Sequence, residues 1–139
     1  MAVKPIQVLL LEDNPGDARL VIELLSDVQS PKFQVTHIEH LSELERNLTR
    51  ARYDVILLDL MLPDSSRLGT LMEIRGSALR VPVVVLTGME DDVVGFWAMS
   101  EGANNYLVKG QVDGPAIAQA IQDAMAAYSS NQPQLRVVK

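Results

Sequence analysis

The stretch Tyr53-Asp54-Val55-Ile56-Leu57-Leu58-Asp59-Leu60-Met61-Leu62-Pro63-Asp64 decides the fold of this 139-residue chain. Residues 54–58 are mostly apolar β-formers, and such a run is typical of a central strand in a parallel sheet. Pro63 and Asp64 are turn residues that end the apolar run. Asp59 therefore lies at the carboxyl end of a core strand, the edge of an open α/β sheet where ligands gather. On this segment alone, an N-cap of the next helix is an equally good interpretation of Asp59.

Four other segments share the strand pattern, and helical patterns separate them. The further strands are expected at 6–11, 33–38, 82–86 and 105–108. Asn14 and Pro15 are typical of a helix start, and Ser42-Glu43-Leu44-Glu45 has the form of a capping box for a second helix. The last three helices are expected near 68–76, 91–102 and 113–128. Five strands that alternate with five helices predict an α/β fold with a doubly wound parallel sheet.

The composition predicts one globular domain over residues 1–128, followed by a polar, flexible tail at 129–139 and no effector domain. The net charge of −6 argues against nucleic-acid binding. The chain has no cysteine, no signal-peptide pattern and no apolar run of membrane-spanning length, so we expect a soluble, cytoplasmic protein. The two histidines, His37 and His40, have no partners at metal-binding spacing and are expected at the surface.

Residues with chemical capacity follow four of the expected strands: Glu12 and Asp13, then Asp59, Thr87 and Lys109. Because parallel strands end at one edge of a sheet, we expect these side chains to converge there. The carboxylates repel one another unless a cation is present, and Mg²⁺ suits a site of carboxylates, waters and a phosphate. Lys109 adds a compact positive charge and Thr87 a hydroxyl. An aspartate in these surroundings is equipped to attack phosphorus and to hold an acyl phosphate.

Four motifs make the sequence similar to the receiver domains of two-component response regulators, of the stand-alone, chemotaxis-regulator-like type, from about Ile6 to Tyr128. Asp59 follows Asp13 by 46 residues and precedes Thr87 by 28 and Lys109 by 50, as expected of that family. The resemblance implies a flavodoxin-like fold with strand order 2-1-3-4-5 and five flanking helices. The motifs are Leu11-Glu12-Asp13-Asn14, Leu57-Leu58-Asp59-Leu60-Met61-Leu62-Pro63-Asp64, Leu86-Thr87-Gly88 and Gly102-Ala103-Asn104-Asn105-Tyr106-Leu107-Val108-Lys109.

The resemblance also implies roles for the matched positions. Asp59 would accept a phosphoryl group from a sensor histidine kinase or a His-phosphotransfer protein. Thr87 and Lys109 would contact the phosphoryl oxygens, and Tyr106 would be an aromatic switch that turns inward as Thr87 moves. Mg²⁺ or Mn²⁺ would be bound by Glu12, Asp13, Asp59 and the backbone carbonyl of Met61.

The sequence departs from the family pattern at two positions. Arg67 stands where a glycine is usual in the loop after Pro63, and it is expected near the mouth of the pocket, where it would tune the lifetime of the phosphoryl group. Gly110 stands where the family lysine is normally followed by a proline joined through a cis bond, so the loop after Lys109 is expected to differ.

The leading hypothesis is a single-domain response regulator that is not an enzyme beyond its own phosphorylation and dephosphorylation. Its output would be onward phosphotransfer, or binding of a protein target by the surface of 91–102, 105–108 and 113–128, with a homodimer also open. One alternative is a receiver-fold interaction module that works without phosphorylation. A further alternative is a small Mg²⁺-dependent phosphohydrolase, which would need a second acid that residues 60–61 do not supply.

Overall fold

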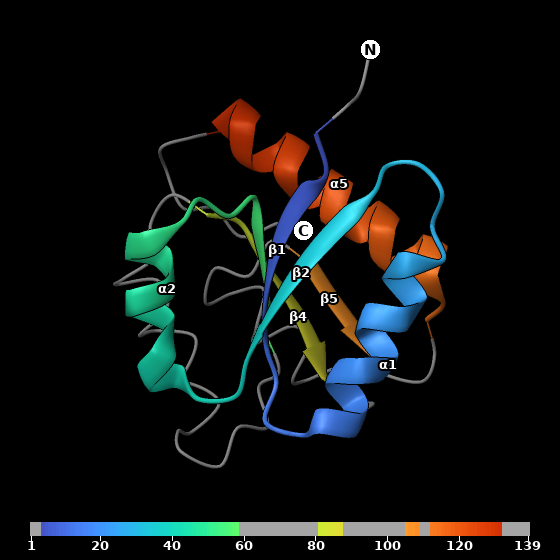
Figure 1. The fold of residues 1–139 in the computed structure, drawn as a ribbon. Helices are drawn as coiled ribbons and strands as arrows, with labels where there is room; N and C mark the ends of the chain where they lie inside the picture. The colour runs from blue at the N-terminus through green and yellow to red at the C-terminus, as the bar shows by residue number, and fades with distance from the viewer. Residues whose placement is uncertain (1–3, 59–80, 88–104, 109–111, 132–139) are drawn as a thin grey trace.

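A five-stranded parallel sheet organises the computed structural model, which describes residues 4–58, 81–87, 105–108 and 112–131 (Figure 1). The strand order is β2-β1-β3-β4-β5, which confirms the predicted fold class. The expected helices near 68–76 and 91–102 lie outside the described residues. The elements are β1 (Ile6–Leu11), α1 (Pro15–Ser26), β2 (Phe33–Ile38), the 3₁₀ helix η1 (Leu41–Glu43), α2 (Leu44–Arg50), β3 (Val55–Leu58), β4 (Val83–Thr87), β5 (Asn105–Val108) and α5 (Gly114–Asn131).

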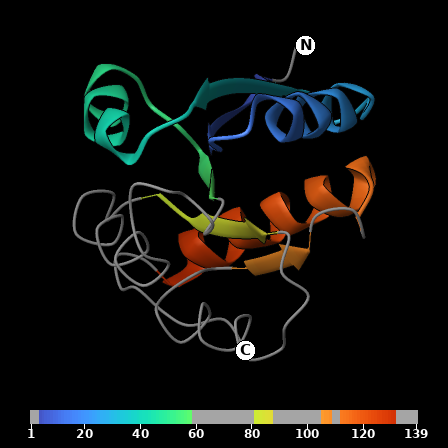
Figure 2. The ribbon, with the colours of Figure 1, turned by 90° about the horizontal axis from the view of Figure 1, so that it is seen from below.

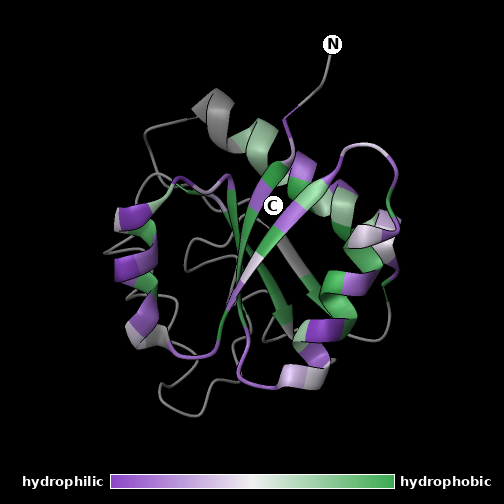
Figure 3. Ribbon diagram, in the orientation of Figure 1, coloured by the Kyte–Doolittle hydropathy of each residue, from purple (hydrophilic) through white to green (hydrophobic). Residues whose placement is uncertain are grey.

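The central strands are buried on both faces, which explains their continuous apolar sequence. Successive strand residues point to opposite sides of the sheet, so alternate residues enter two separate cores. Helices α1 and α5 cover one face and α2 lies on the other (Figures 1 and 2). β3 and β4 are largely hydrophobic along their length, whereas the edge strand β2 mixes hydrophobic and hydrophilic residues (Figure 3). The strand residues in the core under α1 and α5 are Val8, Leu10, Val55, Leu57, Val84 and Leu86.

The start of α1 follows the sequence prediction. The Asn14 side chain accepts a hydrogen bond from the backbone N–H of Asp17 at 3.0 Å, and Pro15 occupies the first turn, where its missing N–H costs nothing. One stripe of the helix then enters the core through Ala18, Val21 and Leu25.

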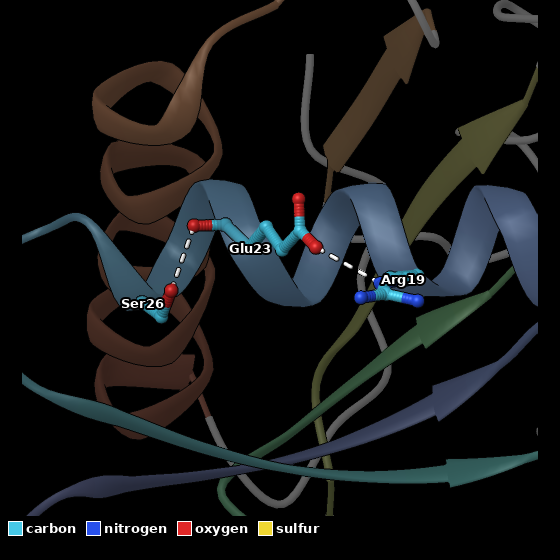
Figure 4. A network of polar contacts seen from close by, with 3 residues as sticks. All are labelled: Arg19, Glu23 and Ser26. Atoms are coloured by element: carbon cyan, nitrogen blue, oxygen red, sulfur yellow. Dashed lines mark hydrogen bonds and ion pairs between the residues drawn. The ribbon is translucent and has the colours of Figure 1, made fainter.

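The outer face of α1 is exposed and carries a small network of polar contacts. Arg19 Nε lies 3.0 Å from Glu23 Oε2, and the hydroxyl of Ser26 donates to the Glu23 carbonyl at 2.8 Å (Figure 4). The side chains of Arg19 and Glu23 are 81% and 60% exposed, so solvent screens their ion pair. This face contributes solubility rather than core stability.

Helix α5 packs against α1 at a point of very close backbone approach. The Asp113 carboxylate accepts from the Ala116 N–H at 2.9 Å and so caps the start of the helix. At Gly114, an added Cβ would lie 2.3 Å from the Leu24 carbonyl oxygen of α1. Only a residue without a side chain fits there. The helix ends at Asn131, three residues beyond the predicted end at Tyr128.

Polar groups form hydrogen bonds between neighbouring strands near the amino-terminal edge of the sheet. Gln7 N–H donates to Asp54 Oδ2 at 2.8 Å, and Asp54 N–H donates to the Gln7 carbonyl at 2.8 Å. The Gln7 side-chain amide also donates to Gln34 Oε1 at 3.0 Å. These bonds join β1 to β2 and to the start of β3, and they help to set the register at the opposite edge.

The predicted capping box of α2 is wrong. Ser42 lies inside η1, and the N-cap residue of α2 is Glu43, which makes no side-chain cap bond to that helix. Glu43 Oε1 instead accepts from the N–H groups of Glu39 and His40, at 3.4 and 3.2 Å. The Glu43 side chain therefore binds the two backbone N–H groups that directly precede η1. The chain turns into a helix earlier than the Ser-x-x-Glu pattern indicates.

Candidate functional site

The register of the sheet brings the carboxyl ends of β1, β2 and β3 into line. Leu11, the last residue of β1, pairs with Ile38 of β2 on one side and with Leu58 of β3 on the other. Leu58 also pairs with Val85 of β4. Leu11 and Leu58, which directly precede Glu12 and Asp59 in the sequence, are therefore paired across neighbouring strands.

Glu12 is a buried carboxylate at this edge. It is 1% exposed and is the one charged side chain among the buried residues of the described part of the chain. Its Oε2 accepts from the Asn14 N–H at 3.2 Å, and its own backbone N–H donates to the Ile38 carbonyl at 3.0 Å. A buried carboxylate is unfavourable without such compensating groups.

Asp13 lies next to Glu12 and is half-buried. Glu12, Asp13 and Asn14 together form the acidic loop, which leads from β1 into α1. Because Asn14 both caps α1 through its side chain and donates to Glu12 through its backbone, the loop is tied to the helix start. The two carboxylates are thus held on a short segment between two rigid elements.

His37 contacts the acidic loop, which the sequence did not indicate. Its Nε2 lies 2.7 Å from the Glu12 carbonyl oxygen, and the side chain is half-buried rather than at the surface. A carbonyl oxygen only accepts, so Nε2 carries the proton. The available signal was the position of His37 one residue before the end of an edge strand, beside β1. His40 is exposed, as expected.

The other predicted site residues divide into two groups. Thr87 is the last residue of β4 and pairs with Val108, the last residue of β5, so these two strands end at the same level. Tyr106 pairs with Val85, two residues before that end. The second group lies outside the residues that the structure describes: Asp59, Met61, Arg67, Lys109 and Gly110.

The donors at the edge are of the kind that a hard cation requires. Glu12 and Asp13 offer carboxylate oxygens, the ligands that Mg²⁺ prefers. Within residues 4–58, 81–87, 105–108 and 112–131, no three His, Cys, Asp or Glu side chains gather as a metal site. The described part of the proposed donor set therefore fits Mg²⁺ in chemistry but supplies two carboxylates only.

No helix in the described ranges is both long and apolar enough to span a membrane.

Comparisons with known proteins agree on one family. A family model described as the response regulator receiver domain matches residues 8–125. The chain is 36% identical over 107 residues to the transcriptional regulatory protein CiaR of Streptococcus pneumoniae. The matched region covers 75% of this chain and 45% of that protein. The chain thus spans about half the length of the curated relatives it matches.

Two solved structures illustrate the likeness in fold. The receiver domain of a LuxO repressor protein from Vibrio parahaemolyticus superposes with a TM-score of 0.77 at 21% identity, over 91% of this chain and 95% of that one. The phosphorylated cyanobacterial phytochrome response regulator RcpA gives a TM-score of 0.65 at 27% identity, over 89% and 91%.

Proposed function

Because the chain belongs to the response regulator receiver domain family of two-component systems, we propose that it is a phosphoryl-accepting switch with Asp59 as the acceptor. The donor is a sensor histidine kinase or a His-phosphotransfer protein. The cysteine-free sequence fits a reducing compartment, and we place the switch in the cytoplasm.

The observation that carries the proposal is the pairing of Leu11 with Leu58. These residues directly precede Glu12 and Asp59 in the sequence, which supports a site at this edge that the two carboxylates share. Carboxylates so arranged are suited to hold a cation beside an aspartate that receives a phosphoryl group. Among the similar proteins, RcpA is described as phosphorylated.

The proposed chemical step is a phosphoryl transfer. A carboxylate oxygen of Asp59 attacks the phosphorus of a phosphohistidine on the donor protein. The O–P bond forms while the N–P bond breaks, and the electron pair of the N–P bond stays on the donor imidazole, which takes up a proton. Water later attacks the same phosphorus, which releases inorganic phosphate and restores the Asp59 carboxylate.

The other site residues have supporting roles in this proposal. Glu12, Asp13, Asp59 and the backbone carbonyl of Met61 hold Mg²⁺ or Mn²⁺, which when bound offsets the negative charge of the phosphoryl oxygens. Thr87 and Lys109 contact those oxygens. Arg67 lies near the pocket mouth and tunes the phosphoryl lifetime, and Gly110 alters the loop after Lys109.

The proposed output is a shift between two conformations. Phosphorylation moves Thr87 and turns Tyr106 inward, which remodels the surface that includes β5 and α5. A protein target binds this surface, or a second copy does, unless the phosphoryl group passes onward in a relay. The chain acts on no external substrate in this scheme, so its catalysis is limited to its own aspartyl phosphate.

Intact-mass spectrometry with acetyl phosphate tests this function. We expect wild type to gain one phosphoryl group in Mg²⁺ and to lose the gain in EDTA. Asp59→Asn should abolish it, whereas Asp27→Asn, at an exposed aspartate that ends α1, should retain it. No gain in wild type, with a cognate kinase also supplied, would favour the phosphorylation-independent module. Steady turnover of an unrelated phosphate ester would favour the phosphohydrolase.

A further inference from the structure

We infer that His37 is a positioning residue that holds the acidic loop in the shape that binds the cation. The inference rests on the proposed metal site. It adds a specific contact from the edge strand β2, which supplies none of the proposed ligands, to the segment that carries Glu12 and Asp13.

The hydrogen bonds between β1 and β2 explain why a side chain is needed here. In a parallel ladder, a residue donates its N–H to the carbonyl of one residue on the neighbouring strand. Its own carbonyl accepts from the N–H of the residue two positions further along that same strand. Glu12 N–H donates to the Ile38 carbonyl at 3.0 Å, so the next ladder donor for the Glu12 carbonyl would be His40 N–H. That N–H is directed to Glu43 Oε1 at 3.2 Å, because the chain turns into η1.

The His37 imidazole supplies a donor at this position. Its Nε2 lies 2.7 Å from the Glu12 carbonyl oxygen. Glu12 is therefore held by β2 at both of its backbone polar groups, through Ile38 on one side and His37 on the other. This contact extends the support of β1 by one residue beyond the end of the strand at Leu11.

The face of the sheet also favours a role for His37 at the acidic loop. Phe33 and Val35 of β2 pack against the core under α1 and α5, and strand alternation places His37 on the same face. Helix α1 begins on this face directly after the loop, with its cap at Asn14. His37 thus lies where the chain crosses from β1 to α1.

Four variants test the inference by calorimetric titration of unphosphorylated protein with Mg²⁺. Glutamine carries an amide N–H at a reach similar to that of imidazole Nε2, whereas the amide of asparagine stops one carbon shorter. We expect His37→Asn and His37→Leu to raise the Kd for Mg²⁺ about fivefold, the loss for one hydrogen bond, and His37→Gln to stay within about twofold of wild type. His40→Leu, at the exposed histidine, is the matched control and should bind as wild type does.

Amide hydrogen exchange in metal-free protein gives a second readout. The Asn14 N–H is bonded to Glu12 Oε2 at 3.2 Å, so its protection reports the order of the acidic loop. We expect faster exchange in His37→Asn than in His37→Gln or His40→Leu. NMR of wild type in alkaline buffer should find the neutral His37 ring protonated at Nε2.

Several results would overturn the inference. They are an Nδ1–H tautomer for His37, unchanged Mg²⁺ affinity in His37→Asn and His37→Leu, or a His37→Gln protein as weak as His37→Asn. Failure of the proposed metal site is a different result, in which wild type binds Mg²⁺ no better than Asp13→Asn. In that case the exchange of Asn14 still decides whether His37 holds the loop.

Discussion

Replacement of Gly114 by alanine is expected to lower the free energy of unfolding by about 2 kcal/mol. The new Cβ would lie 2.3 Å from the Leu24 carbonyl oxygen and 3.1 Å from its carbonyl carbon, both in the backbone of α1. Backbone atoms in a helix do not move aside as a flexible side chain does, so α1 and α5 must separate. Overpacking of this kind costs roughly 1–3 kcal/mol.

A stabilising effect of alanine on the unfolded chain opposes this cost but is smaller than it. Alanine restricts the unfolded chain more than glycine does, and at a compatible site this stabilises a protein by roughly 0.4–1 kcal/mol. The clash with Leu24 therefore decides the sign at Gly114. Gly16 of α1 is a matched control, because its added Cβ would meet only the Asn14 side-chain oxygen, at 3.2 Å. Gly16→Ala should change stability by less than about 0.5 kcal/mol.

Urea unfolding measures both variants. With a slope of roughly 1–3 kcal/mol/M, Gly114→Ala should lower the midpoint by about 1 M, and Gly16→Ala should leave it nearly unchanged. An unchanged or raised midpoint in Gly114→Ala would refute the argument that the close approach of α1 and α5 requires a glycine.

Three further substitutions test other parts of the fold by the same unfolding measurement. Asp113→Ala removes the cap bond to the Ala116 N–H and should cost about 1 kcal/mol, whereas Asp113→Ser should restore most of it. Leu57→Ala empties a fully buried position under α1 and α5 and should cost roughly 2–5 kcal/mol; a loss below 1 kcal/mol would mean that the core collapses around the gap. Arg19→Ala breaks the exposed ion pair with Glu23 and should change stability by less than about 0.5 kcal/mol, and a larger loss would show that the pair is not screened.

The strands and the first helix were predictable because their signals are local. An apolar run buried on both faces, as in β3, has few other folded uses. Asn14 followed by Pro15 satisfies a helix start within four residues, and the structure has that cap at 3.0 Å. The strand order followed from the resemblance of the motifs, and the pairing of Leu11 with Leu58 agrees with it.

Two features could not be predicted because they depend on contacts between elements. The Ser42 capping box was wrong because Glu43 bonds to His40 and Glu39, a choice set by where the chain leaves β2. The His37 contact joins residues 25 positions apart and follows from the register of β1 and β2. Of the candidate site, the sequence predicted the acids themselves, whereas the support of the acidic loop was visible only in the structure.

The contact of α5 with α1 has a consequence for folding during synthesis. Gly114 follows Leu24 by roughly 90 residues, and a ribosome adds about 5–20 residues each second. The apolar face of α1, β1 and β3 therefore remains uncovered for several seconds, until α5 has been synthesised. During that interval the nascent chain exposes hydrophobic surface that chaperones bind, and a chain released before residue 114 would lack the helix that closes this core.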